Sequence, residues 1–142
     1  MSDGTFNLQE MFKLENLITR ERDRFSLRYA IEEDLHPLSV SRVGNTVKAE
    51  ISEWCFITLE DNRCGKAVFL NGTKNEGIVT MTSAVVGVNA GRNFVFTRSG
   101  STYFLKGAAA ELPLNTFRVA SIAGLFNQSL VGPALGMPAV FF

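Results

Sequence analysis

Turn-forming residues recur at short intervals between residues 24 and 106, and this spacing limits the fold more narrowly than any other feature of the sequence. The segments between the turns are about four to eight residues long and rich in Val, Ile, Phe and Thr, which is typical of strands. The turn signals are Gly44-Asn45, Asp61-Asn62 with Gly65, Asn71-Gly72, Asn89-Ala90-Gly91 and Ser99-Gly100. About seven or eight short strands at this spacing predict a small antiparallel β-barrel or a strongly twisted sheet.

Two segments of this β-rich body have informative side-chain patterns. Apolar residues alternate with polar ones over residues 24–31, which predicts a half-buried strand, and Glu32-Glu33-Asp34 ends it as a solvated acidic loop. Residues 54–57 are apolar on both faces, so that strand is expected to pass beneath other structure, with a bulge near Glu53. Further strands are predicted over residues 40–43, 46–59, 67–70, 78–88 with a break at Ser83, 93–97 and 102–105.

A helix is expected at each end of this body, which makes the fold α+β within one domain over residues 1–142. Residues 8–20 have apolar side chains at helical spacing, with Asn7 as the cap and Phe6 and Met11 as a hydrophobic staple. Residues 116–131 predict a second helix, capped by Asn115 or Thr116 and stopped at Gly132-Pro133. Residues 132–142 are expected to form an extended apolar tail.

Charge is balanced in the whole chain but not along it. The sequence has 14 basic and 14 acidic side chains, which argues against a wholly basic nucleic-acid-binding surface. Residues 1–71 have 12 acids and 9 bases, whereas residues 72–142 have 2 acids and 5 bases. A half with so few charges is either deeply buried or covered by a partner. Since no signal-peptide pattern and no uninterrupted run of about 20 apolar residues occurs, we expect a cytoplasmic protein without a membrane span.

The inventory of metal-binding and redox residues is small. With one His and two Cys, a zinc site of several ligands and a disulfide scaffold are both disfavoured. Cys55 and Cys64 are expected to be reduced thiols. We therefore expect no metal and no cofactor.

Four arginines within nine positions form the first candidate binding cluster. Interleaved with Phe25 and Tyr29, they could hold phosphates or a flat base, or contact a partner protein. Neighbouring acids also make the segment typical of a solvated face of mixed charge. The candidate residues are Arg20, Arg22, Arg24 and Arg28.

The turn at residues 98–101 is the second candidate. Its amides could form an anion-binding nest beside the arginines, although the same residues are typical of a plain hairpin turn. A nucleophilic serine would need a base, and His36 is the only His. We therefore expect no enzyme and keep an anion site as the candidate, formed by Arg92, Arg98, Ser99 and Ser101.

The apolar tail is the third candidate. Burying a large apolar side chain stabilises a complex or a fold by about 1.5–3 kcal/mol, so the tail is expected to be covered. It covers its own domain, joins a symmetry mate in a homo-oligomer, or anchors a partner. Its candidate partner-binding residues are Met137, Phe141 and Phe142.

Residues 78–105 have a sequence that resembles a known pattern. The run from Ile78 to Arg92 has Thr-Ser with small apolar residues, and Thr97-Arg98-Ser99-Gly100-Ser101 is followed by Tyr103 and Leu105. This part is similar to a family of short, uncharacterised bacterial proteins whose genes occur on chromosomes and on mobile elements. The resemblance implies a compact β-hairpin unit bearing Arg98 and Tyr103, and it implies no activity.

Together these features favour a non-enzymatic protein-binding module. Its sharpest form is a phage- or plasmid-encoded inhibitor of a bacterial defence complex, as anti-CRISPR proteins are, with a protein or a ribonucleoprotein as partner. One alternative is an oligomeric sponge that binds an anionic small ligand, such as a signalling nucleotide, through Arg92 and Arg98. Another is a phage structural or assembly protein.

Overall fold

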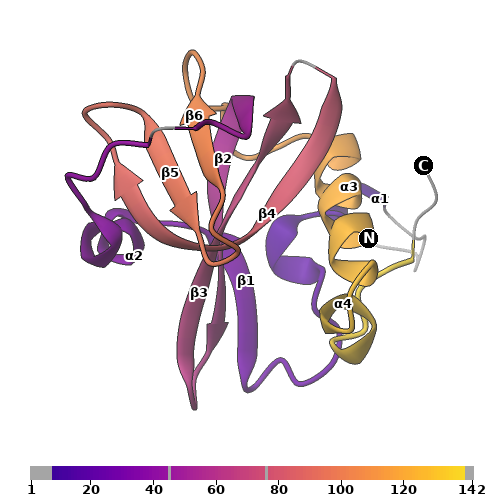
Figure 1. Ribbon diagram of the computed structural model, residues 1–142. Coiled ribbons are helices and arrows are strands. Elements are labelled where there is room, and N and C mark those ends of the chain that lie inside the picture. Colours follow the sequence, from indigo (N-terminus) through magenta and orange to yellow (C-terminus); the bar gives the residue numbers. More distant parts are fainter. Residues whose placement is uncertain (1–7, 45, 76, 140–142) are drawn as a thin grey trace.

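A computed structural model describes residues 8–139 except 45 and 76 (Figure 1). The strands are β1 (Phe25–Tyr29), β2 (Ala49–Asp61), β3 (Gly65–Lys74), β4 (Ile78–Asn89), β5 (Phe94–Thr97) and β6 (Thr102–Leu105). The α-helices are α1 (Leu8–Met11), α2 (Glu32–Leu35), α3 (Thr116–Asn127) and α4 (Val131–Ala134), and two 3₁₀ helices are η1 (Leu14–Asn16) and η2 (His36–Leu38). Figure 1 shows α2 and α3 on opposite sides of the strands.

Strands β2 to β6 form a small five-stranded barrel. Each strand pairs antiparallel with the next, and β6 closes the barrel against β2 with Ala49 opposite Tyr103 and Ile51 opposite Leu105. An odd number of antiparallel strands leaves the first and the last running in the same direction, so the closing pair is parallel. The predicted α+β barrel is therefore confirmed, but the barrel is mixed rather than wholly antiparallel.

Strand β2 lies between two hydrophobic cores. Phe56 points into the barrel core, which is formed by buried side chains of β2 to β6. Its neighbours Cys55 and Ile57 point outward into a second core, which is covered by α3, η1 and the C-terminal segment. This confirms that residues 54–57 pass beneath other structure, because both faces of the strand are buried.

A bulge interrupts β2 where the sequence predicts it. The register shifts between Ser52 and Cys55, and Glu53 has a φ of 50°. The part of β2 before the bulge pairs with β6, and the part after it pairs with β1, from Tyr29 opposite Ile57 to Phe25 opposite Asp61. The bulge thus bends one strand away from the barrel edge and toward a second partner.

The N-terminal helix is shorter than predicted. The backbone of Lys13 is extended and separates α1 from η1, and no helix occurs over residues 17–20. There the amides of Thr19 and Arg20 both donate to the carbonyl of Leu135, at 3.0 Å each. Tertiary pairing has replaced the helical hydrogen bonds that the apolar spacing suggested. The predicted cap Asn7 and the staple residue Phe6 lie outside the described residues.

The structure differs from the prediction at residues 40–48 and at Asn71-Gly72. The described residues of 40–48 form no strand, since the amides of Val40 and Lys48 donate to Val88 and Thr102 as the segment crosses the barrel surface. Asn71-Gly72 lies inside β3 rather than in a turn. A Cβ on Gly72 would lie 2.3 Å from Ile51 Cγ2, so this glycine serves a close approach between strands.

The C-terminal region folds back onto the domain. Helix α3 starts as predicted, with the side chain of Asn115 accepting from the Arg118 amide at 2.8 Å. It ends at Asn127, and Gly132 and Pro133 lie inside α4 instead of stopping a helix. The expectation of a wholly extended tail from residue 132 is therefore wrong, because one further helical turn precedes the segment that enters the core.

We predict that Gly72→Ala destabilises the fold. The new methyl group would overlap Ile51 and approach the backbone oxygen of Ser52 at 2.8 Å, which costs about 1–3 kcal/mol in a packed core. Chemical denaturation measures the free energy of unfolding. Gly77→Ala is the matched control, since its nearest neighbour would lie at 3.6 Å. Equal stability of both variants and the wild type would contradict the close approach.

Candidate functional site

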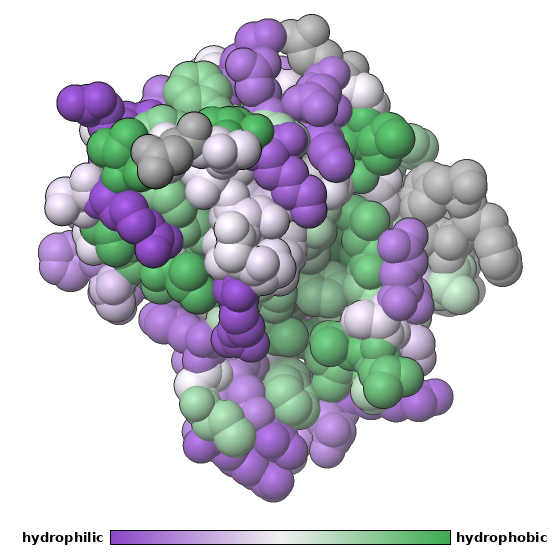
Figure 2. Space-filling model, viewed as in Figure 1, coloured by the Kyte–Doolittle hydropathy of each residue, from purple (hydrophilic) through white to green (hydrophobic). Residues whose placement is uncertain are grey.

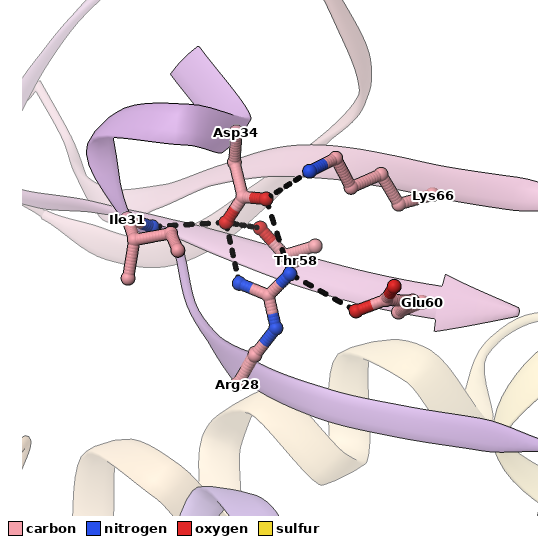
Figure 3. Close-up of polar contacts among 6 residues, drawn as sticks. All are labelled: Arg28, Ile31, Asp34, Thr58, Glu60 and Lys66. Atoms are coloured by element: carbon pink, nitrogen blue, oxygen red, sulfur yellow. Dashed lines mark hydrogen bonds and ion pairs between the residues drawn. The ribbon is translucent and has the colours of Figure 1, made fainter. Parts of the chain in front are cut away.

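A buried carboxylate on α2 organises the main polar cluster of the described structure (Figure 3). Asp34 is 2% exposed, and its oxygens accept from the Ile31 amide at 2.9 Å and from the Thr58 hydroxyl at 3.0 Å. Arg28 from β1 and Lys66 from β3 both pair with it. The cluster therefore joins α2 to three strands of the sheet.

Ion pairing in this cluster favours the charged forms of Asp34 and Arg28. Hydrogen bonds from Arg28, then from Lys66 and the Ile31 amide, hold the pKa of Asp34 well below its usual range, although burial opposes them. Pairing with Asp34 and with Glu60, at 3.0 Å, raises the pKa of Arg28 above its usual range. A carboxylate whose oxygens are all occupied anchors a helix and has no free position for a substrate.

The acidic segment 32–34 is thus not the solvated loop that was expected. Glu32 and Glu33 are exposed, but Asp34 is buried. The physical reason is its place at the third position of a short helix, from which a carboxylate reaches back to the amide before the helix. The sequence signal for this cap is an acidic residue, Asp34, three positions after the end of a predicted strand at Ile31.

The four candidate arginines do not form one surface. Arg24 donates to both oxygens of Asp61, at 2.9 and 2.8 Å, and lies 4.7 Å from the centre of the Phe25 ring. This ion pair also holds the pKa of Asp61 below its usual range. Arg28 belongs to the Asp34 cluster, whereas Arg20 and Arg22 are exposed. A phosphate ligand at Arg24 or Arg28 would have to displace a carboxylate.

The second candidate forms a cluster of hydroxyl groups. Ser99 lies at its centre, with its Oγ atom 3.1 Å from Ser83, 3.1 Å from Thr97 and 3.5 Å from Ser101. These residues come from β4, the end of β5 and the following turn. The structure brings Ser99 and Ser101 together, and it adds Ser83, which the sequence marked only as a strand break.

The backbone of this turn is largely satisfied from within. The amide of Arg98 donates to Ala84, that of Ser99 to the Ser83 hydroxyl and that of Gly100 to Thr97. An anion nest needs amides that point at a ligand, so these bonds match a hairpin turn more closely. Arg92 precedes β5 and Arg98 follows it, so these two arginines lie at opposite ends of the strand.

His36 and Ser99 also lie apart. His36 shares a pocket with Asn93, which comes just before β5, whereas Ser99 comes just after the same strand. The pair does not form a nucleophile with its base.

The tail covers its own domain as far as the structure describes it. Met137 is 5% exposed and lies in the outer core, so its side chain is not presented to a partner. Asn127 donates to the carbonyl of Pro138 at 2.7 Å, and the Thr19 hydroxyl donates to that of Gly136 at 2.7 Å. The other two candidates, Phe141 and Phe142, lie outside the described residues.

An apolar groove runs between α3 and the start of β4. Ile78 is 77% exposed and Phe117 is 65% exposed, and both line it together with Leu125. Leu130, just before α4, is 88% exposed. Figure 2 shows apolar residues gathered over α3 and α4, at the right of the view. None of these was a candidate site residue from the sequence.

A signal for Phe117 was nevertheless present in the sequence. Val119, Ile122 and Phe126 form the buried stripe of α3, and Phe117 falls on the opposite side of the helix at 100° per residue. A large aromatic residue opposite the buried stripe has to face solvent or a partner.

The cysteines and the acids do not assemble a metal site in the part of the chain that the structure describes. Both cysteines are free, and burial raises the pKa of the Cys55 thiol to about 11, which keeps it protonated. Within the same described ranges, no helix is long and apolar enough to cross a bilayer.

Comparisons with protein-family models, with curated proteins and with solved structures found no match to this chain. The resemblance of residues 78–105 to short bacterial proteins whose genes occur on chromosomes and on mobile elements stays a prediction.

We predict that Asp34→Asn lowers stability in a pH-dependent way. Removing a buried charge that holds Arg28 and Lys66 costs about 2 kcal/mol at pH 7. Because the folded pKa of Asp34 lies below its unfolded value of about 3.9, the stabilisation is present above that value and is lost as the pH falls. Urea denaturation between pH 7 and pH 2 measures the difference, which should shrink toward low pH.

Glu33→Gln provides the control for this prediction. Glu33 is an exposed carboxylate on the same short helix, so its neutralisation should change the free energy of unfolding by less than about 0.5 kcal/mol. If Asp34→Asn behaves like Glu33→Gln at pH 7, the cluster does not anchor α2.

Proposed function

We propose that this protein is a non-enzymatic protein-binding module whose binding surface is the apolar groove between α3 and β4. The observation that carries the proposal is the exposure of Ile78 and Phe117, which line this groove together. Exposed apolar patches that hold large side chains mark interaction surfaces in soluble proteins.

The lining of the groove favours a protein partner over a charged ligand. The described residues that form it are apolar or neutral, with polar groups supplied by Ser121, Asn127 and Gln128. Depletion of charge around an aromatic anchor is typical of the centre of a protein interface. The groove therefore fits an apolar segment of a partner, because the Ser121 hydroxyl and the Asn127 amide group already donate to carbonyls within the domain.

Several polar groups outside the groove bond within the domain and are therefore not offered to a ligand. The carboxylates of Asp34 and Asp61 are held in ion pairs, and the hydroxyl of Ser99 bonds to its neighbours. These groups are committed to the fold, whereas the apolar side chains over α3 are presented to solvent. The chemistry that this chain offers outward is thus surface recognition.

The specific form that we propose is an inhibitor of a bacterial defence complex, encoded by a phage or a plasmid. Its support is the predicted resemblance of residues 78–105 to a family of short bacterial proteins, some of whose genes occur on mobile elements. Such an inhibitor needs only a stable surface that occupies a site on a larger assembly, and the barrel with the apolar groove beside α3 meets this need.

We predict that Phe117→Asp strongly weakens partner binding without unfolding the protein. An acid is favourable in the first turn of a helix, so α3 should form, while a charge in the groove opposes an apolar partner. Wild type and variant, both tagged, are used to capture partners from a bacterial lysate, and the captured protein is purified for titration. Loss of an aromatic anchor weakens binding by at least about thirtyfold.

Val43→Asp is the matched control, because Val43 is 48% exposed in the segment that crosses the barrel surface. It should leave the Kd unchanged within about twofold. Equal binding of Phe117→Asp and Val43→Asp would contradict the proposed surface. If the protein is an inhibitor, the wild type should block target cleavage by the defence nuclease that it captures, and Phe117→Asp should not. If the wild type leaves cleavage unimpaired, the inhibitor proposal is rejected but the binding surface is not.

A further inference from the structure

A second pocket lies at one end of the barrel, beneath α2 and η2. Its apolar walls are formed by Trp54 and Phe56 of β2, Leu35 of α2 and Val88 of β4. Barrel mouths are frequent ligand sites, because the strands leave space there that side chains do not fill. The pocket is separate from the groove of α3, since α2 and α3 lie on opposite sides of the strands (Figure 1).

The indole of Trp54 is held in place within this wall. Its Nε1 atom donates to the carbonyl of Gly107 at 3.1 Å, and its ring packs edge-to-face with Phe56 at 6.0 Å between centroids. The one polar atom of the indole is thus already used. Trp54 therefore offers the pocket an apolar, electron-rich surface and no further donor.

The rim of the pocket is acidic. Glu32 lines both the pocket and an adjoining shallow hollow, and Glu33 lines the hollow. Among the described residues that line either of them, none is a lysine or an arginine. Neither glutamate forms an ion pair with a described residue, in contrast to the neighbouring Asp34.

We propose that this pocket binds a small organic ammonium ion with an apolar, aromatic-sized body. The body would lie against Trp54 and Phe56, and the ammonium group would lie at the rim near Glu32. An aromatic wall and a carboxylate both favour a cation over its neutral or anionic analogue. A carboxylate ligand of the same shape would meet Glu32 with no counter-charge from the lining.

The pocket contains its own reporters. Trp54 is the only tryptophan and His36, which also lines the pocket, is the only histidine of the sequence. Tryptophan fluorescence and the ring resonances of one histidine in an NMR spectrum therefore report on this site without labelling.

The test titrates the full chain with phenethylamine and, separately, with 3-phenylpropionate, which has a similar body and the opposite charge. We expect the amine to shift the emission of Trp54 and the resonances of His36 in a saturable way, and the carboxylate to leave both unchanged. Equal responses to the two compounds, or no response to the amine, would overturn the proposal.

Two exposed glutamates make a matched pair of variants. Glu32→Gln should weaken amine binding by about threefold to fivefold, which is the effect of one exposed charge pair. Glu111→Gln, outside the pocket, should leave the affinity for the amine unchanged. An unchanged affinity in Glu32→Gln would reject the acidic rim as the source of selectivity. Phe117→Asp should bind the amine as the wild type does, which separates this site from the groove of α3.

Discussion

Burial of β2 on both faces is the constraint on which the rest of the molecule depends. One strand supplies Phe56 to the barrel core and Ile57 to the outer core, and it pairs with β3 along one edge and with β6 and β1 along the other. Each fully buried apolar side chain contributes about 1.5–3 kcal/mol, so neither core can be removed without exposing β2. Helix α3 and the C-terminal segment are therefore part of the same folding unit as the barrel. The bulge at Glu53 lets one strand serve both neighbours on its second edge.

Local patterns in the sequence predicted the elements that depend on local chemistry. The alternation around Leu27, the bulge at Glu53 and the cap at Asn115 are each confirmed, because each follows from side-chain period or from a nearby hydrogen bond. Predictions failed where a distant residue decides the backbone. The carbonyl of Leu135 accepts from the amides that would have extended the first helix. The side chain of Ile51 lies so close to Gly72 that this position within the strand requires a glycine. The parallel closing pair follows from strand count, which requires every turn to be placed correctly first.

In the candidate site too, local features were predictable from the sequence and contacts between distant elements were not. Arg28 was marked as a binding residue because its charge is visible in the sequence, whereas its partner Asp34 comes from a different element and four further groups complete the cluster. Some charged residues, such as Asp34, bond inward, and some apolar residues, such as Ile78, face outward. This inversion cannot be derived from hydropathy alone, because hydropathy assigns charged groups to solvent and apolar groups to the core. It becomes visible only when the ion pairs and the exposed side chains are seen together.

The parallel closure of the barrel has a consequence for the order of folding. Ala49 and Tyr103, which pair across it, are separated by four hairpins, so this contact has one of the longest loops in the sheet. The hairpins β2–β3, β3–β4 and β4–β5 need only short loops and can form early, whereas closing a long loop carries a larger entropic cost. During synthesis on the ribosome, β2 to β5 emerge before β6, and without β6 the barrel that encloses Phe56 and Leu70 cannot close. Apolar side chains of the barrel interior therefore favour aggregation until the barrel closes, and the extent of aggregation depends on how rapidly β6 docks.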